Sequence, residues 1–148
     1  MAKCLIIYYS YHHGNTEKIA SEMAKAVSAK LSTLDKIKDC NLDDFDTIGF
    51  GSGIAYGKHY ENLLDTVVGM NLLQKKVFVF STSGTGGTNY NKALIGILEK
   101  QSANVIGSFA CKGFDTFGPF KLVGGVAKGH PNDNDFEAAR SFIKDIVK

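Results

Sequence analysis

A short polar stretch near the start of the chain has the residue types of an anion-binding loop. Ser10, Asn15 and Thr16 bring neutral hydrogen-bonding side chains to it, and Gly14 lets the backbone approach an anion closely or adopt a positive φ. Helical spacing of apolar residues begins directly afterwards, and the first turn of a helix has backbone N–H groups without partners. The pattern predicts a cradle for a phosphate group. The alternative is that these side chains only cap the helix.

Two other phosphate-binding patterns do not fit the same residues. A Walker-type nucleotide loop ends in Gly-Lys-Ser/Thr, whereas Asn15 follows Gly14 here. A dinucleotide-binding loop needs three spaced glycines, and this loop has one. His12 and His13 also lie in the loop, where each could reach the phosphate or face solvent. The sequence therefore favours a terminal phosphate held in a neutral cradle.

The elements around this loop alternate between strands and helices. The continuous apolar run 4–9 predicts a strand buried on both faces, and the apolar spacing over 19–27 predicts an amphipathic helix. Further strands are predicted over 31–37, 46–52, 77–82 and 104–111, and further helices start near residues 61, 93 and 132. Gly49 and Gly51 permit close packing of their strand. This alternation predicts a mostly parallel, five-stranded sheet with helices on both faces.

Ligands of such sheets bind beyond the carboxyl ends of the strands, where the strand order reverses. This rule brings together the loops 10–16, 53–60 and 83–90, which follow the first, third and fourth predicted strands. Gly, Ser, Thr, Asn and Tyr are concentrated in the same loops. No Gly-x-Ser-x-Gly motif accompanies them, so no catalytic residue is predicted and hydrolysis is not favoured. We expect one ligand-binding site at this edge of the sheet.

The composition predicts one domain, because 148 residues with 44% hydrophobic side chains can build a core of ordinary size. A net charge of +2 is too small to predict a nucleic-acid partner. Cys4, Cys40 and Cys111 form no Cys-x-x-Cys pair, so neither a metal site nor a disulfide framework is predicted, and Cys4 is expected to pack as a small hydrophobe. Without a membrane-length apolar run or a secretory start, we expect a cytoplasmic protein that does not insert into membranes, and a monomer.

Over essentially its whole length the chain resembles the short-chain flavodoxins, a family that binds flavin mononucleotide (FMN). Ser10 and Gly14-Asn15-Thr16 match the phosphate loop of that family, and Glu17 to Ala20 match the start of the following helix. The resemblance implies a flavodoxin-like three-layer α/β/α sandwich whose five-stranded parallel sheet has the order 2-1-3-4-5. It also implies FMN as cofactor and electron transfer between redox partner proteins as function.

The resemblance assigns cofactor-binding residues to all three loops, since the second and third loops enclose the flavin ring in that family. The residues are Ser10, His12, His13, Gly14, Asn15, Thr16, Gly53, Ile54, Ala55, Tyr56, Gly57, Ser83, Gly84, Thr85, Gly86, Gly87 and Tyr90. The chain departs from the family in the phosphate loop, which has one more residue than usual between Ser10 and Gly14. It is also slightly basic, whereas electron-carrying flavodoxins are usually acidic.

The absence of tryptophan is a further departure, because another aromatic side chain must then cover the flavin. Tyr56 and Tyr90 are the candidates, with Phe114 and Phe117 behind them, and each of the four could instead pack in the core or on the surface. The charged residues of the second loop, Lys58 and His59, are expected to point to solvent.

Three function classes compete within this predicted fold. The first is an electron carrier. The second is a flavin-dependent oxidoreductase acting on NAD(P)H, a quinone or a similar small molecule, for which the irregular segment 112–131 could cover a substrate pocket. The third is a flavin-free signalling module, which ranks last because the acidic cluster of a receiver domain is missing near Ser10 and Thr82. Rapid nicotinamide turnover would favour the enzyme over the carrier.

Overall fold

Strands and helices alternate along the chain in the computed structural model, which describes residues 3–10, 14–113 and 127–147. The strands are β1 (Cys4–Tyr9), β2 (Lys30–Thr33), β3 (Thr47–Ala55), β4 (Lys58–His59), β5 (Lys76–Ser83) and β6 (Asn104–Lys112). The α-helices are α1 (Asn15–Val27), α2 (Glu61–Val68), α3 (Lys92–Lys100) and α4 (Asp133–Ile146). Short 3₁₀-helices are η1 (Leu34–Asp39), η2 (Leu42–Asp44) and η3 (Thr88–Asn91). None of the helices described is long and apolar enough to cross a membrane.

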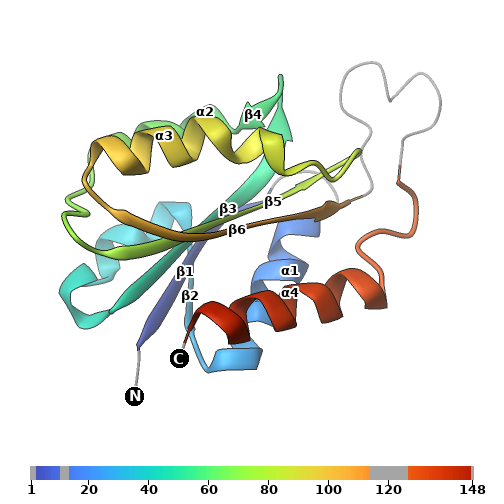
Figure 1. The fold of residues 1–148 in the computed structure, drawn as a ribbon, viewed down its shortest axis with the longest axis horizontal. Coiled ribbons are helices and arrows are strands. Elements are labelled where there is room, and N and C mark those ends of the chain that lie inside the picture. The colour runs from blue at the N-terminus through green and yellow to red at the C-terminus, as the bar shows by residue number, and fades with distance from the viewer. Residues whose placement is uncertain (1–2, 11–13, 114–126, 148) are drawn as a thin grey trace.

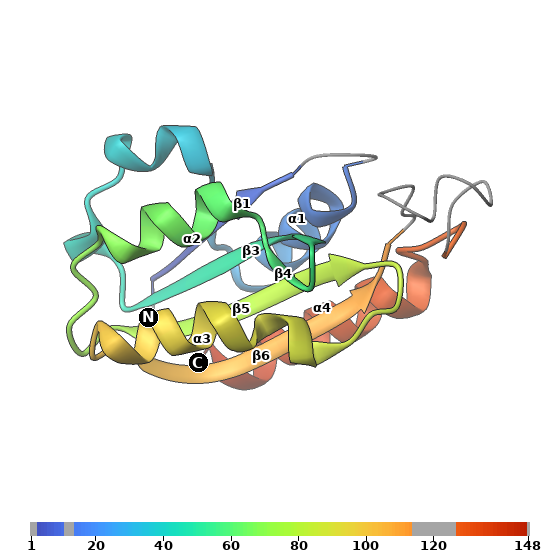
Figure 2. The ribbon, with the colours of Figure 1, turned by 90° about the horizontal axis from the view of Figure 1, so that it is seen from above.

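Five of the strands form one parallel sheet in the order β2-β1-β3-β5-β6, and the two-residue strand β4 pairs antiparallel with β3. Numbered without β4, this is the order 2-1-3-4-5, so the predicted topology is confirmed. Helices α2 and α3 cover one face of the sheet, and α1 and α4 cover the other (Figures 1 and 2). The three layers explain why the strands need apolar side chains on both faces.

Strand β1 shows this two-sided burial directly. Leu5 and Ile7 belong to the core cluster under α2 and α3, whereas Ile6 and its neighbours on the other face belong to the cluster under α1 and α4. Cys4 is in the second cluster, and burial raises the pKa of its thiol to about 12. The thiol therefore stays protonated at neutral pH and packs as a small hydrophobe, as predicted.

The glycines of β3 make room for two phenylalanine rings of the neighbouring strand. A Cβ atom on Gly49 would collide with the Phe78 ring, and one on Gly51 would collide with the Phe80 ring. Phe78 and Phe80 are fully buried and stack on each other with their centroids 6.3 Å apart. The close packing predicted from these glycines is therefore present. The two rings occupy the space that a side chain at either glycine position would need.

Two predicted elements differ from those observed. The second strand was expected over 31–37, but β2 ends at Thr33 and the chain continues as η1, which buries Leu34. The expected loop 53–60 is mostly a β-hairpin, because β3 continues to Ala55 and β4 returns beside it. Tyr56 and Gly57 both have positive φ, at 54° and 79°, as a tight two-residue hairpin turn requires.

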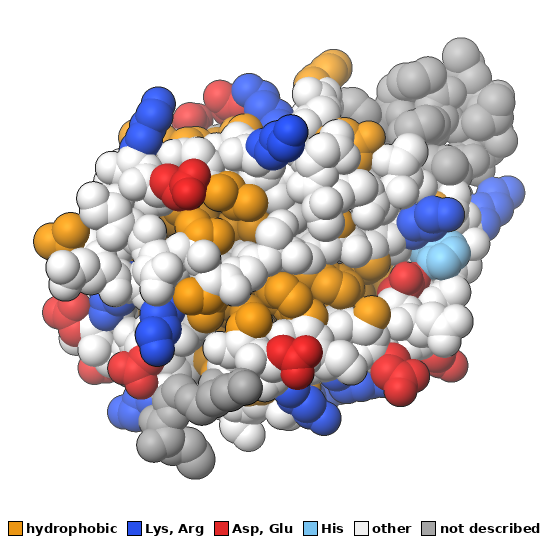
Figure 3. Space-filling model, in the orientation of Figure 1, with side chains coloured by type: hydrophobic (Ala, Val, Ile, Leu, Met, Phe, Trp, Pro, Cys, Tyr) orange, Lys and Arg blue, Asp and Glu red, His pale blue; other side chains and the backbone are white. Residues whose placement is uncertain are grey.

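Strand β6 forms one edge of the sheet. Its side chains from Val105 to Ala110 are half-buried, and Figure 3 shows an apolar band across the face where β6 lies between α3 and α4. The register with β5 shifts between Val77 and Phe78, so the pairing of this edge strand is irregular at that point.

Candidate functional site

The candidate site residues that the structure describes lie at the carboxyl edge of the sheet, which is the border where the parallel strands end and is distinct from the outer strand β6. Strands β1, β3 and β5 are parallel neighbours, so the segments that follow them emerge side by side at their carboxyl ends. Ser10 follows β1, Gly53 to Ala55 end β3, and Ser83 ends β5. The helix after β1 lies on one face of the sheet and the helix after β3 on the other (Figure 1). A crevice for a ligand is expected where consecutive connections leave opposite faces in this way.

The start of α1 is the part of this edge suited to an anion. Gly14 occupies the N-cap position with φ 65°, and no side-chain hydrogen bond caps the helix there. The hydroxyl of Ser10 accepts from the backbone N–H of Glu17 at 3.4 Å, a long bond. Gly14 itself adds no side chain in front of the 13-residue helix, where a Cβ on it would lie 3.9 Å from a carboxylate oxygen of Glu17. The helix dipole favours negative charge at this end.

The side chains of the first helical turn hold α1 against the sheet. Thr16 is 2% exposed, and its hydroxyl lies 2.9 Å from the hydroxyl of Thr82 on β5. Asn15 is buried against Gly113, where an added Cβ would lie 2.7 Å from Asn15 Nδ2. These residues lie inside the helix rather than at its cap, so the backbone of this turn is positioned by contacts with β5 and with the residue after β6.

The hairpin after β3 forms a second part of the edge. The ring of Tyr60, directly after β4, lies beside Gly53 and packs edge-on against Tyr9 with centroids 5.4 Å apart. Tyr56 is 90% exposed at the hairpin turn. Lys58 is exposed as expected, and its Nζ lies 3.4 Å from a carboxylate oxygen of Glu61. The hairpin therefore presents an aromatic tip and a locally balanced pair of charges.

His59 is buried, so the expectation that it points to solvent was wrong. It is 1% exposed, with Nδ1 at 2.7 Å from the Ser52 hydroxyl and Nε2 at 2.7 Å from Oδ1 of Asn91. Burial lowers the pKa of His59 to about 4, and the hydrogen bond with Asn91 offsets only part of that effect. The imidazole is therefore neutral at pH 7.

The tautomer of His59 follows from the bonds of Asn91. The amide nitrogen of Asn91 donates to the hydroxyl of Ser108 at 2.8 Å and to the carbonyl of Phe109 at 3.1 Å. The oxygen of the Asn91 amide therefore faces His59 and accepts from its Nε2–H. Nδ1 is then the acceptor nitrogen and lies 2.7 Å from the Ser52 hydroxyl, whose single proton is also within 2.7 Å reach of the Gly53 carbonyl. This buried chain of bonds joins β3, β4, η3 and β6.

The loop after β5 forms the third part of the carboxyl edge and is stabilised by hydrogen bonds between its own residues. The hydroxyl of Ser83 accepts from the backbone N–H of Gly86 at 2.8 Å, and the hydroxyls of Thr85 and Tyr90 lie 3.0 Å apart. Gly86 has φ 73° and passes close to the backbone of Lys112. The position of the Tyr90 ring is thus linked to the conformation of the loop.

Some predicted residues cannot be placed. His12, His13, Phe114, Phe117 and most of the segment 112–131 lie outside the described residues. Among residues 3–10, 14–113 and 127–147, no group of three His, Cys, Asp or Glu side chains could hold a metal ion.

Sequence reasoning missed three residues that build this edge, namely Thr82, His59 and Asn91. Thr82 meets Thr16 across 66 positions, and Asn91 meets His59 across 32. Only Thr82 had a usable signal, because it comes near the end of a predicted buried strand where polar residues are uncommon. Nothing in the spacing of His59 distinguishes it from a solvated loop histidine.

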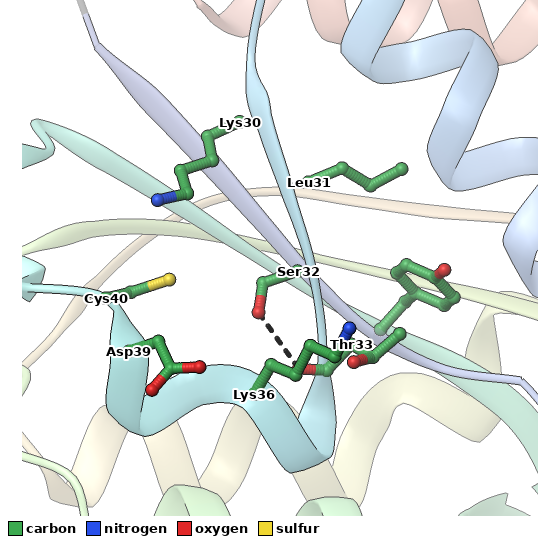
Figure 4. Close-up of a pocket in the computed structure, with 8 residues that line it drawn as sticks. Lys30, Leu31, Ser32, Thr33, Lys36, Asp39 and Cys40 are labelled. Atoms are coloured by element: carbon green, nitrogen blue, oxygen red, sulfur yellow. Dashed lines mark hydrogen bonds between the residues drawn. The ribbon is translucent and has the colours of Figure 1, made fainter.

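A separate cavity of about 260 Å³ lies between β2 and η1 (Figure 4). Its lining includes charges of both signs from Lys30, Lys36 and Asp39. The hydroxyl of Ser32 donates to the carbonyl of Thr33 at 3.0 Å, as the dashed line in Figure 4 marks. Because its charges are mixed and this hydroxyl is already bonded, the cavity favours no class of ligand, in contrast to the glycine-capped start of α1.

Comparison with known proteins agrees with this geometry. The family model of the flavodoxin domain matches residues 5–112. An uncharacterised protein of Methanocaldococcus jannaschii is 40% identical over 148 residues, covering 99% of each chain. The fold is similar to that of a flavodoxin from the domain Archaea, with a TM-score of 0.68, 19% identity and coverage of 97% of this chain and 95% of that one.

A second solved structure covers 100% of this chain and 99% of its own, with a TM-score of 0.65 and 15% identity. It is a variant of a Fusobacterium nucleatum flavodoxin bound to flavin mononucleotide. At these identities the two structures support the fold alone, whereas the family model covers most of the chain. The chain therefore belongs to the flavodoxin-like family.

Proposed function

We propose that the chain binds FMN at the carboxyl edge of the sheet and carries electrons between redox partner proteins. The observation that carries the proposal is the glycine-capped start of α1, placed beside the ends of β3 and β5. Membership of the flavodoxin-like family supports the cofactor, as does the flavin mononucleotide bound to the Fusobacterium nucleatum relative.

The donor set at α1 fits the phosphate of FMN. A phosphate needs several hydrogen-bond donors and benefits from positive potential, and the first turn of a helix supplies both. Gly14 adds no side chain in the way, and the hydroxyl of Ser10 lies within reach of the same turn. The backbone N–H groups of Asn15 and Thr16 would hold the phosphate, because contacts with Gly113 and Thr82 fix that turn in place.

The two remaining loops would hold the flavin ring between them. Backbone groups of 53–57 approach from the hairpin and those of 83–87 from the loop after β5, while Tyr56 and Tyr90 supply aromatic surface. When bound, FMN supplies the electron chemistry, and the protein binds, orients and shields it.

The charges of the hairpin bear on how this site treats a reduced, negatively charged flavin. A free cation beside the ring would stabilise that charge and raise the reduction potential. His59 is neutral at pH 7 because burial lowers its pKa to about 4, and Lys58 is paired with Glu61. The described part of the hairpin thus brings no unpaired positive charge to the ring, which favours a low potential.

Titration of the apoprotein with FMN and with riboflavin tests the cofactor assignment. Riboflavin has the same ring without the phosphate. If the start of α1 holds the phosphate through several charge-assisted bonds, FMN should bind at least about a hundredfold more tightly than riboflavin. Equal affinities would remove the phosphate from α1, and failure to take up either flavin would overturn the proposed function.

Stepwise anaerobic reduction of the FMN-loaded protein then separates the carrier from an oxidoreductase. A carrier should accept electrons one at a time and show no sustained oxidation of NADH or NADPH. Rapid nicotinamide oxidation coupled to reduction of a quinone would instead assign the protein to flavin-dependent oxidoreductases. The titration uses the apoprotein and the reduction uses the FMN-loaded protein, so the cofactor and the reaction are tested in separate experiments.

A further inference from the structure

We propose that His59 is a positioning residue that fixes the hairpin over 54–59 relative to the loop after β5, and thereby sets the geometry of the two walls of the flavin site. The inference rests on the proposed function, because it concerns how this chain shapes its site for FMN. It assigns to His59 a role in the redox properties of the bound cofactor, although its side chain lies within the protein beneath the hairpin.

The hairpin depends on His59 for its buried attachment. The outgoing strand ends with half-buried Ile54 and Ala55, and the turn carries Tyr56, which is 90% exposed. An added Cβ on Gly57 would meet nothing within 4 Å, so the turn is open around this residue. In the returning strand Lys58 is exposed, whereas His59 is 1% exposed and opposite Ile54. The inward-facing side chain of the returning strand is therefore the imidazole.

The imidazole connects this hairpin to the other wall. Its Nε2–H donates to Asn91, the last residue of η3, which ends the segment that also carries Tyr90. Asn91 is fully buried and donates in turn to Ser108 and to the Phe109 carbonyl on β6. On its other side, Nδ1 of His59 lies 2.7 Å from the hydroxyl of Ser52 on the central strand β3, which also reaches the Gly53 carbonyl at 2.7 Å. Both walls are thus tied through one side chain to two strands of the sheet.

Histidine suits this position because a flat ring with two nitrogens bridges two partners in opposite directions. Glutamine keeps an N–H donor for Asn91 but has no acceptor at the place of Nδ1. Alanine removes both bonds and leaves the buried oxygen of Asn91 without its donor, a loss typical of large mutational effects. Glutamine should therefore restore most of what alanine removes.

The consequence for the cofactor is specific to redox state. A hairpin that is no longer tied down would shift the backbone groups of 53–57 that face the ring. The oxidised and reduced forms of a flavin differ in charge and in their hydrogen-bonding atoms, so displaced groups change their affinities by different factors. A mere loss of folding stability would instead leave the ratio of those affinities unchanged in the folded protein.

The test uses the full chain as wild type and as His59→Ala, His59→Gln and Ser52→Ala, with Ser81→Ala as control. Ser81 is also a buried polar residue on a central strand, but its hydroxyl has no hydrogen-bond partner among the described residues. Three quantities are measured for each protein. They are the dissociation constant for FMN, the two midpoint potentials of the bound flavin, and amide hydrogen exchange of the apoprotein over 54–60 and 88–91.

In His59→Ala we expect FMN affinity to fall about tenfold, the separation of the two midpoint potentials to change, and exchange to accelerate in both segments together. His59→Gln should recover most of each property, and Ser52→Ala should give a smaller change of the same kind. Ser81→Ala should match the wild type. Should His59→Ala not fold, the glutamine and Ser52 variants carry the same comparison.

Two outcomes overturn the inference in distinguishable ways. If wild type binds FMN and the His59 and Ser52 variants keep its potentials and its hairpin exchange, the proposed function stands and the role of His59 falls. If wild-type apoprotein takes up no FMN, the proposed function fails first and the inference falls with it.

Discussion

The hydroxyl of Thr16 lies 2.9 Å from the hydroxyl of Thr82, and both side chains are buried. This contact joins the first turn of α1 to the carboxyl end of β5. It means that the central sheet helps to position the backbone N–H groups proposed to hold the phosphate.

Replacing Thr16 by aspartate should weaken FMN binding strongly. The carboxylate would be buried beside Thr82, under the helix turn that is proposed to hold the phosphate. Like charges about 4 Å apart near a protein surface repel by about 4 kcal/mol. We expect at least a hundredfold loss of affinity in a fluorescence titration. Thr16→Ser keeps the hydroxyl and should bind FMN nearly as wild type. An aspartate variant with unchanged affinity would show that the phosphate lies elsewhere.

The stability of the apoprotein should fall between pH 6.5 and pH 4 because of His59. Its pKa is lowered to about 4 in the folded protein, against 6.5 for an unburied histidine, so the unfolded chain binds the proton first. The contribution is complete above pH 6.5 and decreases as the pH falls, by about 3 kcal/mol at pH 4.

Urea denaturation of wild type and His59→Gln at a series of pH values isolates this effect. Carboxylates contribute equally to both proteins, so the difference between the two curves reports the imidazole. We expect the advantage of wild type over the variant to shrink as the pH falls. Parallel curves would mean that His59 has an ordinary pKa and is not buried as described.

Gly51→Ala should destabilise the protein, because the new methyl group would collide with the buried Phe80 ring. Overpacking of this kind costs about 1–3 kcal/mol. Gly96→Ala is the matched control, since a Cβ at that position of α3 meets nothing within 4 Å. The helical substitution should stabilise by about 0.5–1 kcal/mol. Thermal denaturation of both variants gives opposite shifts if the Gly–Phe packing is as described.

Ser81→Ala should leave stability unchanged or raise it by up to about 1 kcal/mol. The hydroxyl of Ser81 is buried without a hydrogen-bond partner among the described residues, and a polar group in that position costs free energy that alanine does not. Chemical denaturation measures the difference. A clear loss of stability would reveal a bond from Ser81 to a residue or water beyond the described contacts.

Local sequence patterns predicted much of the architecture. The continuous apolar run of β1 predicted a strand covered on both faces. The helix predicted to start near residue 132 is α4, and Asn132 caps it by accepting from the Asp135 N–H at 3.1 Å. Such features depend on neighbours within a few residues, so the sequence states them directly. The second predicted strand failed at Thr33, where burial of Leu34 in a 3₁₀-turn outweighed a weak strand preference.

By itself, the sequence determined the alternation of strands and helices, the five-stranded order implied by its family resemblance, and the three polar segments at the strand ends. Only the tertiary structure decided which polar side chains are buried in the interior of the protein. In the sequence, Thr16 reads as a residue at the start of a helix and His59 as a residue of a loop, so neither is expected to be buried. In the structure both are buried, and each lies within hydrogen-bond distance of a residue many positions away. The physical reason is that burial and hydrogen bonding of a polar group depend on the packing of distant segments, which no local pattern encodes.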